Sequence, residues 1–229
     1  NTAENGAGIY HEKNAGLNLN ANSEVYFMNN VANKFGGATY LEKDANIVSY
    51  VDVGANRKSL YFNGNKAVTG SSVYIKERAI TTFMSLGYAE FSNETNTAAS
   101  SITKAEDNKE IRAGIIAFKG YLRLGSRNNL VFDNNKDTAT SKVGSCIVNL
   151  GDDGQDAFYM YSTTTVDKAA IKFINNELIC NAIDLYNVKG STGYQVSDGT
   201  YLNRISTSHS NDEKNTFANL INIDGGSAV

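Results

Sequence analysis

The densest group of acidic residues in the sequence lies in the turn-rich segment 151–156, which contains Asp152, Asp153 and Asp156. Carboxylate oxygens are the hard ligands that Ca²⁺ prefers, and glycoside hydrolysis uses two carboxylates about 5–9.5 Å apart. The three aspartates lack the D-x-[DN]-x-[DN]-G spacing of a regular calcium loop, and such a turn is more often simply solvated. They are candidate metal ligands only, and we expect no catalytic residue, no bound metal and no cofactor.

The cysteines and histidines supply little material for a zinc site or a Ser-His-Asp triad, since the chain has 2 of each. Cys146 and Cys180 fall in corresponding segments of neighbouring repeats. Stacked repeats could bring them within the Cα separation of about 4.4–6.8 Å that a disulfide needs. Two interpretations stay open: a disulfide between Cys146 and Cys180, or two buried free thiols.

Three tyrosines share one position, just after a short segment of small residues: Tyr10, Tyr40 and Tyr74. If the repeats stack in register, their rings form a column on one face. Tyrosine is favoured at interfaces, so the column is a candidate binding surface for a protein or a glycan. The alternative is a set of half-buried strand positions, because alternation fixes only that neighbouring side chains point in opposite directions.

Composition narrows the class of protein further. With 41% hydrophobic residues, 229 residues can bury a sizeable core. The net charge of -3 argues against nucleic acid as a partner, and no apolar run approaches the ~20 residues of a membrane span, so we expect no direct membrane insertion. The chain has no Pro but is rich in Gly and Asn. This composition indicates many short paired strands joined by tight turns.

A repeated Phe-x-x-Asn tetrad predicts how these strands are arranged. It is followed after roughly ten residues by small residues that lead into a β-former, as in Gly36-Gly37-Ala38-Thr39. The irregular spacing favours an all-β, right-handed parallel β-helix over a β-propeller or a β-sandwich. Like residues of successive coils then stack, so we expect an interior phenylalanine stack and a corner asparagine ladder. These positions are Phe27, Phe62, Phe91, Phe132 and Phe173, and Asn30, Asn65, Asn135 and Asn176.

One copy of the tetrad departs from the pattern, because Glu94 stands where the others have asparagine. We expect this residue to interrupt the ladder. The whole chain, 1-229, is predicted to be a single β-helix segment of a longer protein, with about six irregular coils. Corner insertions are expected near 103-112, 151-168 and 189-215, and such loops are where binding residues usually lie.

The pairing of FMNN with GGAT, FNGN with GSSV, FDNN with GSCI and FINN with CNAI resembles the repeats of chlamydial polymorphic outer membrane proteins. More broadly it is similar to the passenger domains of type V autotransporters. The resemblance covers Gly6 to Ala228. It implies an exported virulence protein that is displayed at the cell surface, outside the outer membrane, and acts as an adhesin.

The predicted function is therefore an extracellular bacterial surface protein that binds a host or bacterial surface protein or glycan through loops on a β-helical rod. It is not predicted to be an enzyme. Two alternatives are kept: a polysaccharide lyase or glycoside hydrolase, since parallel β-helices also carry such enzymes, and a structural subunit of a filament or sheath. The last alternative would use end-to-end self-association through exposed strand edges.

Overall fold

The computed structural model describes residues 1–18, 24–50, 59–97, 113–137, 144–150, 157–162, 171–174, 176, 183–185, 193–196, 205–207 and 221–223. Within these residues every regular element is a β-strand, and every strand pairing is parallel. The predicted all-β class is confirmed. Parallel pairing also separates this fold from sandwiches and propellers, which are built from antiparallel strands.

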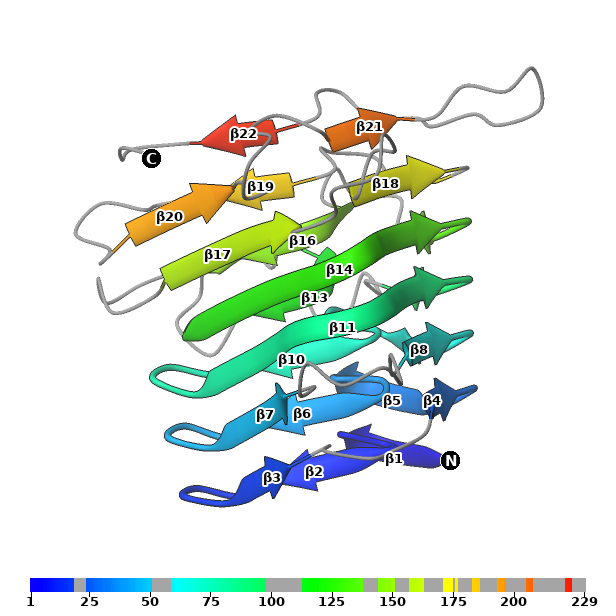
Figure 1. Cartoon of the computed structure of the whole chain (residues 1–229). Helices are drawn as coiled ribbons and strands as arrows, with labels where there is room; N and C mark the ends of the chain where they lie inside the picture. The colour runs from blue at the N-terminus through cyan, green and yellow to red at the C-terminus, as the bar shows by residue number, and fades with distance from the viewer. Residues whose placement is uncertain are drawn as a thin grey trace.

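The strands form three sheets, and within each sheet the strands lie one above another along a single direction (Figure 1). Sheet A contains β1 (Thr2–Asn5), β5 (Val31–Phe35), β9 (Lys66–Ala67), β12 (Thr95–Asn96) and β15 (Lys136–Asp137). Sheet B contains β2 (Ile9–His11), β6 (Thr39–Leu41), β10 (Val73–Ile75), β13 (Ala113–Phe118), β16 (Gly144–Asn149), β19 (Ile183–Leu185) and β22 (Ile221–Ile223).

Sheet C is the largest. One part contains β3 (Gly16–Asn18), β7 (Asn46–Tyr50), β17 (Ala157–Ser162) and β20 (Gly193–Val196), and the other contains β4 (Val25–Met28), β8 (Ser59–Asn63), β18 (Ile171–Ile174) and β21 (Ile205–Thr207). The long strands β11 (Ile80–Ser92) and β14 (Tyr121–Asp133) run through both parts.

The chain visits the sheets in the order A, B, C and then returns to A, as β1 to β4 and β5 to β8 show. We call one such circuit a pass. Neighbouring passes are in register, so that residues of the same motif lie beside each other. Phe27 pairs with Phe62, Phe62 with Phe91, Phe91 with Phe132, and Phe132 with Phe173.

The corners between sheets are made by residues with left-handed backbone conformation. Between C and A these are Asn29, Gly64, Asn93 and Asn134, the third residues of the first four tetrads; between A and B they are Gly6, Gly36 and Gly70; between B and C they are Asn14, Asp44 and Arg78. Glycine and asparagine adopt this conformation at little cost. The corners therefore account for part of the abundance of both residues in the sequence.

The core fills the space that the sheets enclose. Phe62, Phe91, Phe132 and Phe173 are fully buried and Phe27 is 8% exposed. Their rings stack in sequence with centroid separations of 4.8, 4.9, 5.0 and 5.2 Å. These separations are close to the ordinary distance between paired strands, so the stack follows directly from the register.

Two of the segments predicted as insertions contribute strands to sheet C. β17 lies within 151-168 and pairs with β14, while β20 and β21 lie within 189-215 and pair with β17 and β18. The tetrad and the small-residue element mark only the C-to-A and A-to-B corners, so the sequence motifs do not indicate the strands that lie farther from them. The segment 103-112 lies outside the described residues.

Candidate functional site

The asparagines of the tetrads form a buried ladder along the corner between sheets C and A. The amide nitrogen Nδ2 of Asn30 donates to Oδ1 of Asn65 at 2.9 Å, and the backbone nitrogen of Asn30 donates to the same oxygen at 3.0 Å. Asn135 makes the equivalent pair of bonds to Asn176, at 2.8 and 3.1 Å. The oxygen of Asn65 or Asn176 thereby satisfies one backbone and one side-chain donor of the preceding pass, as a buried polar group must.

Glu94 takes the asparagine position in this ladder, and the expectation that it would interrupt the ladder is wrong for the acceptor oxygen but holds for the amide donor, since the carboxyl group has no N–H. Its Oε1 accepts from Nδ2 and from the backbone nitrogen of Asn65, at 2.8 and 3.1 Å, as an asparagine oxygen does elsewhere. Its backbone nitrogen donates to Oδ1 of Asn135 at 3.0 Å. The longer side chain also reaches Ser72, whose hydroxyl donates to Oε2 at 2.8 Å. A carboxyl oxygen is as good an acceptor as an amide oxygen.

Burial dominates the electrostatics of Glu94, because the side chain is fully buried and its side-chain hydrogen-bond partners are neutral. Loss of solvation raises the pKa of this carboxyl to about 8, although hydrogen bonds from Ser72 and Asn65 oppose the rise. Two lysines flank its chain neighbour Thr95 in sheet A, Lys66 and Lys136, but both side chains are exposed. Glu94 is thus a buried acid that is neutral over most of the pH range.

The predicted tyrosine column exists, but most of it is inaccessible. Tyr10 stacks on Tyr40 and Tyr40 on Tyr74, with ring centroids 5.1 and 5.5 Å apart. Only Tyr10 is substantially exposed, at 47%, whereas Tyr40 and Tyr74 are buried. Phe35 of sheet A stacks on Tyr74 at 4.7 Å. The column therefore mainly packs a corner, and it offers one accessible ring.

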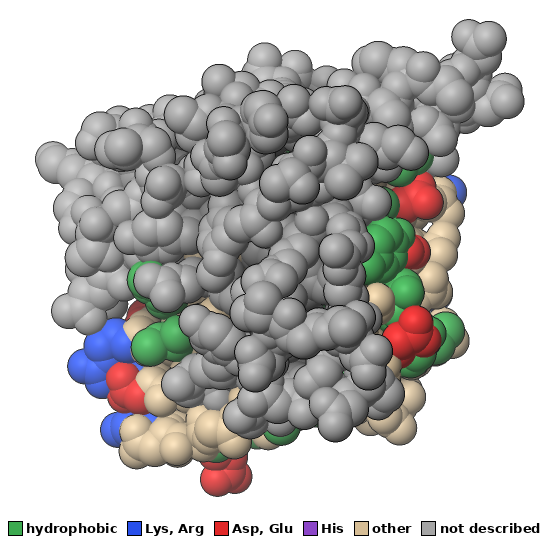
Figure 2. Space-filling view, in the orientation of Figure 1, with side chains coloured by type: hydrophobic (Ala, Val, Ile, Leu, Met, Phe, Trp, Pro, Cys, Tyr) green, Lys and Arg blue, Asp and Glu red, His purple; other side chains and the backbone are tan. Residues whose placement is uncertain are grey.

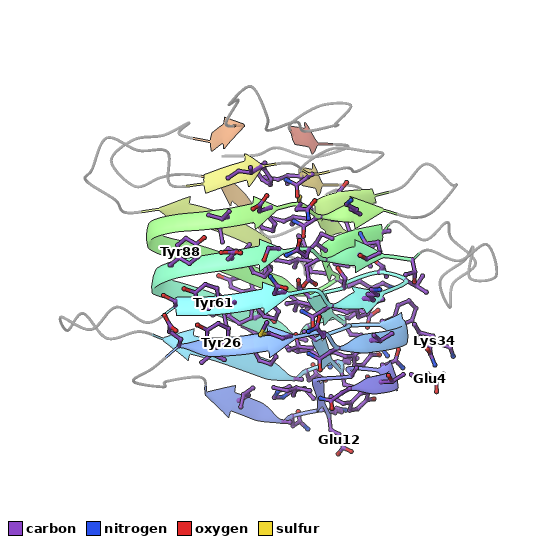
Figure 3. All side chains as sticks on the ribbon, turned by 90° about the vertical axis from the view of Figure 1, so that its right-hand side faces the viewer. Glu4, Glu12, Tyr26, Lys34, Tyr61 and Tyr88 are labelled. Carbon is purple, nitrogen blue, oxygen red and sulfur yellow. The ribbon has the colours of Figure 1, made fainter. Side chains whose placement is uncertain are left out.

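A second set of tyrosines, which were not among the predicted site residues, lies on the outer face of sheet C. Tyr26, Tyr61 and Tyr88 come from β4, β8 and β11 and lie one above another (Figure 3). The ring centroids of Tyr26 and Tyr61 are 4.7 Å apart, and those of Tyr61 and Tyr88 are 5.6 Å apart. Tyr26 is 53% exposed. We call these three residues, together with Glu24 and Glu90, the tyrosine row.

A signal for the tyrosine row was present in the sequence. Tyr26 and Tyr61 each directly precede the phenylalanine of a tetrad. Because side chains alternate along a strand, the residue before a buried phenylalanine must point outward. Figure 2 shows hydrophobic and acidic side chains together along the right-hand edge of the molecule, where Figure 1 places the ends of β4 and β8.

Two glutamates accept hydrogen bonds from the tyrosine row. The hydroxyl of Tyr26 donates to Oε2 of Glu24 at 2.5 Å, and that of Tyr88 donates to Oε2 of Glu90 at 2.6 Å. The bond to Glu24 raises the pKa of Tyr26 to about 12. Burial, followed by the bond to Glu90, raises the pKa of Tyr88. Both phenols therefore stay protonated at physiological pH and remain donors to the carboxylates.

The remaining predicted site residues are the two cysteines and the candidate metal ligands. Cys146 is a buried free thiol, and burial raises the pKa of that thiol; its pairing with Cys180 stays a prediction. Cys180 itself and the candidate metal ligands Asp152, Asp153 and Asp156 lie outside the described residues. In the part of the chain that is described, no group of three or more His, Cys, Asp or Glu side chains is placed to hold a metal ion.

No helix capable of spanning a bilayer occurs among the residues described. Comparisons of the chain with family models, with curated proteins and with solved structures found no match.

Proposed function

We propose that this chain is a segment of a right-handed parallel β-helix that serves as an adhesin, displayed outside a bacterial outer membrane as an autotransporter passenger. Three observations support the β-helix: the repeated A, B, C circuit of the chain, the in-register parallel pairing, and the stacking of like residues. Right-handedness is the rule for crossovers between parallel strands. The surface location and the adhesin role rest on the sequence resemblance.

The observation that carries the binding function is the tyrosine row. Tyr26 and Met28 of β4 are 53% and 51% exposed on the outer face of sheet C. Exposed aromatic side chains on a rigid strand are typical of binding surfaces, since they bury a large area at a low cost in conformational entropy. The phenylalanine stack beneath fixes the spacing of the row, because Tyr26 and Tyr61 are the chain neighbours of Phe27 and Phe62.

Loss of binding in a double variant tests this proposal. The purified chain is applied to a printed glycan array and to immobilised cell-surface proteins, and the bound ligands are tested again with Tyr26→Ala/Tyr61→Ala. We expect binding to fall at least tenfold, since removal of central aromatic anchors typically costs about 2 kcal/mol or more. Tyr10→Ala is the matched control, because Tyr10 is an exposed tyrosine at a different position, in sheet B.

The same experiment addresses the enzymatic alternative. Each array spot is checked for released oligosaccharide after incubation. Cleavage of a glycan, abolished by Glu24→Gln or Glu90→Gln, would replace the adhesin proposal with a glycoside hydrolase. Equal binding by the wild type and by Tyr26→Ala/Tyr61→Ala would show that the tyrosine row is not the binding surface.

A further inference from the structure

The carboxylates of the tyrosine row differ from most other described carboxylates at the surface. Four of those others are paired with a cation from a neighbouring pass: Glu4 with Lys34, Glu42 with Lys76, Asp44 with Arg78, and Glu77 with Lys119, at 2.5, 3.2, 2.6 and 3.5 Å. Glu24 and Glu90 instead accept from tyrosine hydroxyls. Within the described part of the chain neither has a cationic partner. Among the acids whose side chains are described, Glu12 is a further exposed one without such a pair; Glu24 is exposed too, whereas Glu90 is half-buried.

The outward positions on β4, β8 and the end of β11 supply no cation either, and the first cation in register with Glu90 is Lys172 of β18, two strands away. The outward positions of β4, β8 and the last part of β11 are Tyr26, Met28, Ser59, Tyr61, Asn63, Tyr88, Glu90 and Ser92, and none of them is Lys or Arg. The surface is therefore anionic and aromatic. A carboxylate that already accepts one hydrogen bond from a phenol still has lone pairs for a further donor. The exposed Tyr26 ring lies beside Glu24 and could contact a cation in addition.

We propose that the tyrosine row binds a cationic polypeptide segment, whose Lys or Arg side chains form the ion pairs that this surface lacks. This inference rests on the proposed function, in which the row is the binding surface. Charge complementarity selects the ligand: Glu24 directly precedes β4 and Glu90 lies on β11, with β8 between these two strands. Strands are about 4.8 Å apart and residues rise about 3.3 Å along a strand, and the register places Glu90 level with Tyr26, two residues beyond Glu24. The backbone positions of the two glutamates are therefore about 12 Å apart, a distance that the flexible side chains of alternate lysines on an extended segment can span.

The probe that tests this inference is a short fluorescent peptide that alternates lysine and glycine, and binding is followed by anisotropy. We expect binding at about 20 mM NaCl that weakens strongly at about 0.5 M NaCl, because salt screens exposed charges. The same peptide with acetylated lysines should not bind. Glu24→Gln/Glu90→Gln should lower the affinity roughly three- to tenfold, as expected for two exposed ion pairs.

A matched control separates a local effect from an effect of net charge. Glu4→Gln/Glu12→Gln removes the same amount of charge from exposed positions on sheet A and on the corner after sheet B. Its affinity for the peptide should stay within about twofold of wild type, because long-range interactions between exposed charges are weak. Equal losses in both double variants would overturn the inference, since binding would then follow net charge alone.

The failures of the two proposals are distinguishable. If a neutral glycan binds in a manner that needs Tyr26 and Tyr61 while the lysine peptide does not bind, the cationic ligand is wrong and the adhesin proposal stands. If the peptide binds wild type and Glu24→Gln/Glu90→Gln equally, the row is not its site. If Tyr26→Ala/Tyr61→Ala changes binding of no ligand at all, both proposals fail.

Discussion

Replacement of Glu94 by glutamine should remove a large part of the pH dependence of stability. The carboxyl has a pKa of about 8 when buried, against an ordinary value of 4.5. At pH values between 4.5 and about 8, the folded chain therefore keeps a proton on Glu94 that the unfolded chain has released. Its contribution to stability is fully present below pH 4.5 and is lost as the pH rises toward 8. Each pKa unit corresponds to about 1.4 kcal/mol, so the whole shift contributes about 5 kcal/mol to the free energy of unfolding.

The assay compares unfolding free energies of wild type and Glu94→Gln at several pH values from 5 to 8, by urea denaturation followed with circular dichroism. Other titrating groups contribute equally to both proteins, so the difference between the two curves isolates Glu94. Glutamine keeps the acceptor for Asn65 and can donate to Ser72. We expect the variant to gain several kcal/mol relative to wild type between pH 5 and pH 8.

Two further variants test the reasoning. Glu94→Asn restores the residue found in the other tetrads, and it should also lose the pH dependence. Glu12→Gln removes an exposed carboxylate and should leave the wild-type curve in place. Parallel curves for wild type and Glu94→Gln, differing by a constant amount at all pH values, would refute the claim that Glu94 is a buried neutral acid.

Three other outcomes follow from the packing. Phe62→Ala should lower the free energy of unfolding by about 3–5 kcal/mol, because Phe62 is fully buried between two stacked rings; a cost below about 1 kcal/mol in urea denaturation would contradict the stack. Gly36→Ala should cost at least about 2 kcal/mol, since φ is +66° and the new Cβ would overlap the carbonyl oxygen of Thr39, whereas Gly16→Ala has open space and should cost less than about 1 kcal/mol. In a Cys180→Ser background, Cys146 should react with a thiol reagent only in denaturant, because its thiol is fully buried; rapid reaction in native buffer would show that it is accessible.

The sequence predicts the interior well because each tetrad marks two stacked positions at once. Phe62 and Asn65 recur with the same offset in the other passes, and in-register pairing turns that offset into a stack and a ladder. A change of residue type at position 94 does not reveal that the acceptor is kept, because the ladder requires an acceptor oxygen there and a carboxyl group also has one. The reach of the Glu94 side chain to Ser72 depends on the A-to-B corner of the preceding pass, which no local pattern reveals.

The third corner of each pass was missed for a similar reason. The residue with left-handed backbone is Asn14 in one pass, Asp44 in the next and Arg78 in the third, so no residue type recurs at this position. Arginine rarely adopts this conformation, but the Arg78 guanidinium donates two hydrogen bonds of 2.6 Å to Asp44. The position is held by an interaction between passes, and sequence within one pass cannot show it.

The sequence does not show which tyrosines are buried, because a side chain that points outward from one sheet can be covered by residues of another sheet. Tyr40 and Tyr26 both point outward, yet Tyr40 packs in a cluster with Tyr74 and Phe35 from sheets B and A, while Tyr26 remains exposed. The two columns therefore have different roles despite the same residue type. Because the tetrad fixes the register, the outward residue before each phenylalanine is free to vary without loss of the core. These positions are occupied by Tyr26, Tyr61, Glu90, Val131 and Lys172. That freedom makes this face of sheet C the one on which a binding surface can change while the stacked interior does not.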